Sequence, residues 1–135
     1  MASIFSRIVS GAIPAAKVYE DEQTLAFLDI NPAARGHTLV ICKEELPDLL
    51  SLAPEQVAAV ARATQVVARA IVAALQPDGF NIVQNNGEAA GQTVHHYHVH
   101  IIPRWRGDRV LSPWRPGSAT ADELHAIAAQ IIAQL

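Results

Sequence analysis

The segment Thr93-Val-His-His-Tyr-His-Val-His-Ile-Ile102 contains four of the six histidines of this 135-residue chain. Its mix of β-branched, aromatic and apolar residues is typical of a β-strand. Successive side chains on a strand point to opposite faces. We therefore predict a strand over 93–102 in which His96, His98 and His100 share one face, while the residues between them point to a buried opposite face.

The rest of the chain predicts four more strands and three helices. The long helix has apolar residues at 3.6-residue spacing, which indicates that one side covers a sheet. We find no repeat, linker or low-complexity tract, so 1–135 is expected to form a single α+β domain with a five-stranded antiparallel sheet. The expected elements are a short helix over 3–11, strands over 17–20, 24–30, 37–42 and 80–84, a helix from Pro54 to Leu75, and a C-terminal helix after the capping-box pattern Thr120-Ala-Asp-Glu123.

Composition narrows the class of protein. Half of the residues are hydrophobic, and ten Lys and Arg against thirteen Asp and Glu give a formal net charge of −3. No broad basic surface is therefore expected to bind nucleic acid. The single cysteine, Cys42, excludes an internal disulfide, and the N-terminus does not resemble an export signal, so we predict a cytoplasmic protein. The apolar segment from Val57 to Leu75 is interrupted by arginines and polar residues, which argues against a membrane span.

Three interpretations of the histidine segment follow from residue chemistry alone. The histidines could be structural or solvated, they could bind a metal ion, or they could act in acid–base and nucleophilic chemistry. At a rise of about 3.3 Å per residue, His96 and His100 lie about 13 Å apart, so at most two of the three could share one ion. Strict alternation in a row of three favours catalysis or phosphate binding over the other two interpretations.

The loop before the histidine segment favours phosphate binding. Gly87 and Gly91 allow backbone N–H groups to approach a ligand closely, and Asn85, Gln92 and Thr93 offer neutral donors. The loop lacks the order of a P-loop, and the chain has no paired acidic metal site. We therefore do not expect a magnesium-dependent kinase or NTPase.

Taken together, these residues resemble the histidine-triad family of nucleotide hydrolases and transferases. The family motif of alternating histidine and apolar residues appears here as His96-Tyr-His-Val-His-Ile-Ile102, preceded by Gly91-Gln-Thr-Val94. The stretches Ile4-Phe-Ser-Arg-Ile8, Ala26-Phe-Leu-Asp-Ile-Asn-Pro32 and Gly36-His-Thr-Leu-Val-Ile41 are similar to the family's opening helix, ribose-binding strand and third strand. The resemblance implies a homodimer whose two sheets join, with a variable tail over 104–135.

The resemblance also implies a chemistry without metal or cofactor. His98 would attack the α-phosphorus of a purine nucleotide and form a nucleotidyl-histidine, which water then cleaves. His96 and His100, with His37, would orient His98 and stabilise or protonate the phosphate and the leaving group. The implied nucleotide contacts are Asp29 on the ribose hydroxyls, Phe5, Ile8, Phe27 and Ile30 around the base, and Asn85, Gln92 and Thr93 on the phosphate.

The sequence also allows purely structural roles for several of these residues. Asp29 could form the turn before Asn31-Pro32, Phe27 and Ile8 could be core residues, and His37 could be a solvated strand end.

The chain departs from many bacterial relatives in the opening helix. Those relatives carry Cys-x-x-Cys there as part of a structural zinc site, whereas this chain has Ser3 and Ser6, with Glu45 where a histidine ligand is expected. We therefore predict no zinc.

The function predicted from the sequence is nucleoside phosphoramidate hydrolysis. The alternatives are dinucleoside polyphosphate hydrolysis and a nucleotide-binding regulatory module with little turnover. The tail from Arg104 to Arg115, which contains two tryptophans and four arginines, could clamp a second phosphate, contact a dimer partner or form a solvated surface.

Overall fold

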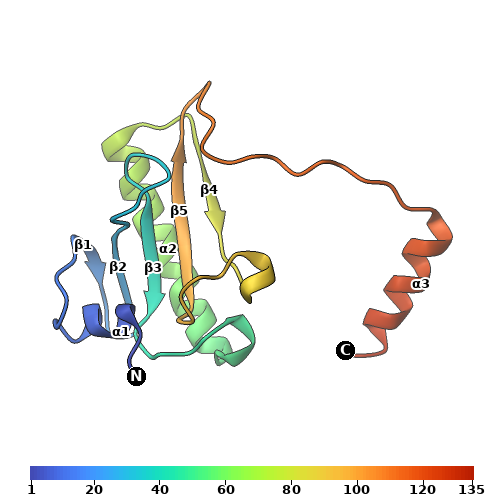
Figure 1. The fold of residues 1–135 in the computed structure, drawn as a ribbon, viewed down its shortest axis with the longest axis horizontal. Helices are drawn as coiled ribbons and strands as arrows, with labels where there is room; N and C mark the ends of the chain where they lie inside the picture. Colours follow the sequence, from blue (N-terminus) through green and yellow to red (C-terminus); the bar gives the residue numbers. More distant parts are fainter.

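The computed structural model describes all 135 residues. Five antiparallel strands form one sheet of order β1-β2-β3-β5-β4, with one helix against each face and a third helix well away from the sheet (Figure 1). The predicted α+β class is therefore confirmed. The elements are α1 Ile4–Val9, β1 Lys17–Glu20, β2 Thr24–Leu28, β3 Thr38–Cys42, α2 Pro54–Leu75, β4 Gly79–Val83, β5 His98–Arg104 and α3 Ala121–Ile132, with short 3-10 turns at Leu49–Ser51 and Glu88–Ala90.

Alternation along the strands divides the core into two clusters. On β3, Val40 and Cys42 point toward α2, whereas Leu39 and Ile41 point toward α1. The α2 cluster is the larger one, and it buries one side of that helix against the sheet. By length and composition alone α2 could cross a membrane, but a helix that packs on the core of a domain passes the same test.

The histidine strand β5 begins five residues later than predicted, at His98, and continues to Arg104. Residues 93–97 form a loop because other groups take their hydrogen bonds. The Tyr97 N–H donates to the Leu46 carbonyl at 2.7 Å, and the Gln92 amide donates to the Val94 carbonyl at 3.0 Å. The predicted strand ends at Ile102, whereas in the structure Pro103 also belongs to β5 and pairs with Phe80 of β4. The pairing of β5 with β3 stops at Ile101, so the proline lies where only one neighbouring strand continues.

The connection between β2 and β3 brings Asp29 and His37 to one end of the sheet. The Asp29 N–H donates to the His37 carbonyl at 2.9 Å, which closes the loop. Gly36 adopts φ +85°, and a side chain there would clash with Leu75 of α2. The positive φ favours glycine here, and any larger residue would also require the Leu75 side chain to shift.

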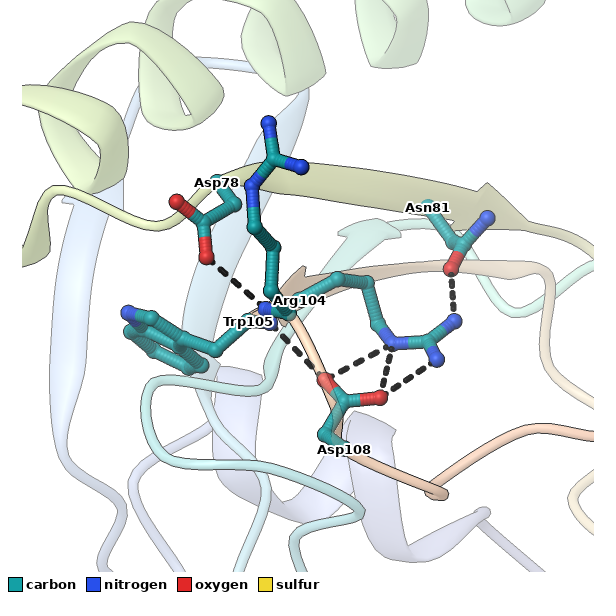
Figure 2. A network of polar contacts seen from close by, with 6 residues as sticks. Asp78, Asn81, Arg104, Trp105 and Asp108 are labelled. Atoms are coloured by element: carbon teal, nitrogen blue, oxygen red, sulfur yellow. Dashed lines mark hydrogen bonds and ion pairs between the residues drawn. The ribbon is translucent and has the colours of Figure 1, made fainter.

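A polar network fixes the chain where it leaves β5 (Figure 2). The Arg104 side chain donates to the Asp108 carboxylate from Nε at 3.0 Å and to the Asn81 carbonyl oxygen at 2.7 Å. Asp108 also accepts from the Trp105 N–H at 2.8 Å, and Asp78 accepts from the Arg106 N–H at 2.8 Å. Arg104 is thus an anchor within the fold.

Beyond this network the chain runs away from the sheet to α3 (Figure 1). Every residue from 111 to 135 is exposed. The predicted cap of the last helix is confirmed, since the Thr120 hydroxyl accepts from the Glu123 N–H at 3.2 Å.

Candidate active site

A cleft of about 320 Å³ opens on the α1 side of the sheet. It brings together residues from α1, the end of β2, the loop before β5, and β5 itself, although these are far apart in the sequence. Apolar side chains form most of its wall, and two histidines, a carboxylate, an amide and a hydroxyl provide polar groups. Of the predicted site residues, the cleft is lined by Phe5, Ile8, Phe27, Asp29, Ile30, Thr93, His98 and His100.

His98 lies in the wall of the cleft with its ring orientation fixed. Its Nδ1 lies 2.6 Å from the backbone carbonyl of His96, and because a carbonyl only accepts, Nδ1 carries the proton. The lone pair is therefore on Nε2, which has no hydrogen-bond partner in the protein. The edge of the ring packs on Phe5, with centroids 5.0 Å apart. Burial lowers the pKa of His98, which keeps the ring neutral and nucleophilic near neutral pH.

His37 and His100 form a directed hydrogen-bond chain. The Ala33 N–H donates to His37 Nδ1 at 2.9 Å, so the His37 proton is on Nε2. Nε2 of His37 lies 2.9 Å from Nδ1 of His100 and donates to it. In its neutral form His100 therefore carries its proton on Nε2. Burial lowers the pKa of His37, and burial together with the neighbouring His98 and His37 lowers the pKa of His100 to about 4.

Asp29 stands beside this chain at the end of β2. One carboxylate oxygen accepts from the Asn31 N–H at 2.8 Å, and the other lies 3.6 Å from His37 Nε2. The ligand atoms of Asp29, His37 and His100 lie within 4.8 Å of one another, a spacing that could hold a metal ion. The His37–His100 hydrogen bond occupies both facing nitrogens, so an ion there would have to replace that bond.

His96 was predicted, with His100 and His37, to orient His98 and to stabilise or protonate the phosphate and the leaving group. His96 lies on the same side of the sheet as His98, but it is fully buried and does not line the cleft. Its Nε2 donates to the Cys42 carbonyl at 2.6 Å, and its Nδ1 lies 2.7 Å from the Ser3 hydroxyl. Both nitrogens thus have protein partners, and the contribution of His96 to the cleft is the carbonyl that holds His98.

Ser3, Ser6 and Glu45, which stand where many relatives have zinc ligands, form a hydrogen-bonded cluster. Glu45 accepts from the Ser3 N–H and from the Ser6 hydroxyl, both at 2.6 Å. Ser3 in turn contacts His96. The sequence alone did not predict that this cluster would contact His96.

The three predicted phosphate contacts have different surroundings. Thr93 lines the cleft and is exposed. The side-chain amide of Gln92 is buried, and it accepts from the Gly87 N–H and donates to the Pro47 and Val94 carbonyls. Gln92 therefore shapes the loop and has no free donor for a ligand. Asn85 lies outside the cleft wall, next to Gly91.

Comparison with known proteins gives the same assignment as the site geometry. The family model described as HIT domain matches residues 10–107. The chain is 48% identical to Protein hit of Bacillus subtilis over 113 residues, which cover 83% of this chain and 78% of that protein. It is 37% identical to the Schizosaccharomyces pombe protein named adenosine 5'-monophosphoramidase hnt1, over 100% of this chain and 99% of that one.

A solved structure extends the likeness to the whole chain. The crystal structure of a member of the HIT family from Bacillus subtilis superposes with a TM-score of 0.94 at 40% identity, and the match covers 100% of this chain and 98% of that one. The histidine cleft and these matches lead to one conclusion: the chain belongs to the HIT domain family.

Proposed function

We propose that this protein is a hydrolase that cleaves purine nucleoside phosphoramidates at the α-phosphate, without a metal ion, through a nucleotidyl-His98 intermediate. One observation carries the proposal: His98 presents an unpartnered Nε2 in the cleft while the His96 carbonyl holds Nδ1–H. The fission-yeast relative, whose name describes an adenosine monophosphoramidase, supports this substrate class.

In the first proposed step, His98 Nε2 forms a bond to the α-phosphorus and the phosphorus–nitrogen bond breaks. The leaving nitrogen takes up a proton from water and departs as an amine. The Nε2–H of His100, oriented by His37, donates a hydrogen bond to the phosphoryl oxygens as negative charge shifts onto them. In the second step, water attacks the phosphorus, the bond to Nε2 breaks, and the nucleoside monophosphate is released.

The wall of the cleft fits the nucleoside part of this substrate. Asp29 accepts hydrogen bonds well, and we assign it to the ribose hydroxyls, while the base would lie among Phe5, Ile8, Phe27 and Ile30. We assign the hydroxyl of Thr93, which lines the cleft, to the phosphate. Of these residues, Ile30 is the most exposed, which leaves room for a planar ligand to cover it.

We further propose that the homodimer predicted from the sequence forms through the edge strand β4. This edge exposes Phe80 and Ile82, at 43% and 48%, and carries no charged residue. The opposite edge, β1, carries Lys17 and Glu20, and charges on an edge strand discourage pairing. Edge pairing through β4 would join the two sheets.

Dinucleoside polyphosphate hydrolysis is the second candidate. Arg106, Arg109 and Arg115 are exposed after the Arg104 anchor and have no ion-pair partner in the chain. They are therefore available for a second phosphate group.

The experiment is to incubate the protein with adenosine phosphoramidate or with diadenosine polyphosphate and to search for adenylyl-His98 by mass spectrometry. We expect the adduct and faster turnover of the phosphoramidate, with activity that survives a chelator. Full turnover by a His98→Ala variant would refute the mechanism. Tight AMP or GMP binding without hydrolysis of any substrate in a panel would instead indicate a nucleotide-binding regulatory module.

A further inference from the structure

The C-terminal helix α3 has no partner within its own chain. All of its residues are exposed, including Leu124, Ile127 and Ile131, at 59%, 54% and 59%. These three residues follow helical spacing and form an apolar stripe along one side. A 12-residue helix is marginally stable in water by itself, so α3 needs a surface against which to bury this stripe.

An unfilled apolar groove lies on the α2 side of the sheet, whereas the candidate active site opens on the α1 side. It has a volume of about 420 Å³ and runs between the second half of α2 and strands β1 and β2. Nine of its twelve lining residues are hydrophobic, among them Val18, Leu28, Val66, Ala70 and Ala74. We call it the α2–β1 groove.

The tail does not lie on its own groove. The chain after Arg104 leads away from the sheet, and α3 is separate from the body of the molecule (Figure 1). The Bacillus subtilis HIT family crystal structure has the same course, because residues after Arg104 make up more than a fifth of the chain and a TM-score of 0.94 over its whole length requires them to superpose. The apolar stripe of α3 is therefore not covered by its own chain.

The charges of α3 and the groove, and the length of the segment before α3, both favour a second copy of this chain as the partner of α3. The first turn of α3 carries Asp122 and Glu123, the helix has no Lys or Arg, and the only charged residue of the groove is Arg35, which has no ion-pair partner in the chain. The twelve residues 109–120 span about 40 Å when extended. If two sheets pair through β4, β1 of the second copy lies six strand spacings from β5, the strand that leads into the tail, or about 29 Å.

We propose that α3 of each copy docks in the α2–β1 groove of a second copy, with its apolar stripe against the groove and its acidic first turn near Arg35. The exchange is reciprocal in a two-fold dimer, so each chain both gives a helix and receives one. The proposal concerns assembly alone and is independent of the proposed hydrolase chemistry.

The test is a disulfide between two different full-length chains. A tagged Ile127→Cys chain and an untagged Ala70→Cys chain are co-expressed, oxidised with diamide and separated on a non-reducing gel. The native Cys42 stays in place, because it is buried and burial raises the pKa of its thiol. We expect a covalent dimer that contains one tagged and one untagged chain.

A matched control is Ala73→Cys, since Ala73 is an exposed alanine of α2 that lines a different hollow beside β4. We expect no crosslink between it and Ile127→Cys. A crosslink there, a dimer of two Ile127→Cys chains, or no crosslink at all would overturn the proposal. So would an intrachain disulfide in the Ile127→Cys/Ala70→Cys double variant, because it would place α3 on its own groove.

Discussion

The Nε2 atom of His37 lies 2.9 Å from Nδ1 of His100, although 63 positions separate the two residues in the sequence. The register between β3 and β5 produces this contact, since Thr38 pairs with Ile101 and Leu39 with His100. A backbone N–H at Ala33 fixes the direction of the hydrogen bond by occupying the other nitrogen of His37. The loop between β2 and β3 therefore fixes the hydrogen-bonding state of the His100 ring in the cleft.

Loss of the nucleophile is expected to abolish turnover. His98→Ala removes the only cleft imidazole whose unpartnered nitrogen carries a lone pair, and we expect kcat/KM for adenosine phosphoramidate to fall by roughly 10³-fold or more. His95→Ala is the matched control, because the His95 side chain is 58% exposed and belongs to the loop. We expect the control to keep nearly full activity, and an equal loss in both variants would contradict the assignment of His98.

His37 and His100 are expected to act as a unit. His100→Ala should lower kcat by about 10²-fold, the lower range for a positioned acid–base group. His37→Ala should lower it by about tenfold, because His100 then loses the donor that orients it. In the double variant we expect little further loss than in His100→Ala alone, since residues in one hydrogen-bond network are not additive. Fully multiplicative losses in steady-state kinetics would show that the two histidines act separately.

Asp29 is expected to discriminate ribose from deoxyribose. A hydrogen bond to a charged group contributes about 1.5–3 kcal/mol, so Asp29→Asn should lower kcat/KM for a ribonucleotide substrate about 10- to 100-fold. The 2'-deoxy substrate should lose less. If both substrates lose activity equally and the pH profile shifts, the carboxylate acts through His37, which lies 3.6 Å away.

Ser3 is expected to stabilise the fold through His96. Ser3→Ala removes the hydroxyl at the buried Nδ1 of His96 and also the N-cap of α1, so we expect the free energy of unfolding to fall by about 1–3 kcal/mol. Urea denaturation measures this change. Ser3→Thr keeps the hydroxyl and should restore most of the stability, whereas Ser10→Ala, which alters an exposed hydroxyl, should have an effect below about 0.5 kcal/mol.

Stability is expected to decrease in acid because of the buried histidines. The pKa of His100 is about 4 in the folded protein, against an ordinary value of 6.5. As the pH falls below 6.5 the unfolded chain binds protons that the folded chain rejects, so the free energy of unfolding should fall until about pH 4 and then level off for this group. Denaturation between pH 8 and pH 4 checks this, and His100→Gln should show a shallower slope. Equal slopes would assign the acid sensitivity to other groups.

Much of the fold follows from local patterns. Alternation along β3, the 3.6-residue periodicity of α2 and the Thr120 cap each act over a few residues, and each predicts its element. The pattern over 93–102 predicts a strand but places its start five residues before that of β5. Alternation also places His98 and His100 on the same face of the sheet. Cleft residues such as Phe5 and Asp29 were implied by family resemblance, since their sequence positions alone do not show which residues they meet.

The sequence by itself determined the class of fold and the histidine face, because side-chain direction on a strand is a local property. Only the tertiary structure decided which nitrogen of each histidine is free, since Ser3, Cys42 and Ala33 reach those rings from distant segments. It also decided that the Gln92 amide forms its hydrogen bonds within the protein and that α3 lies apart from the sheet. Hydrogen-bond partners and uncovered apolar surfaces depend on how distant segments pack together, and local sequence patterns do not specify that packing.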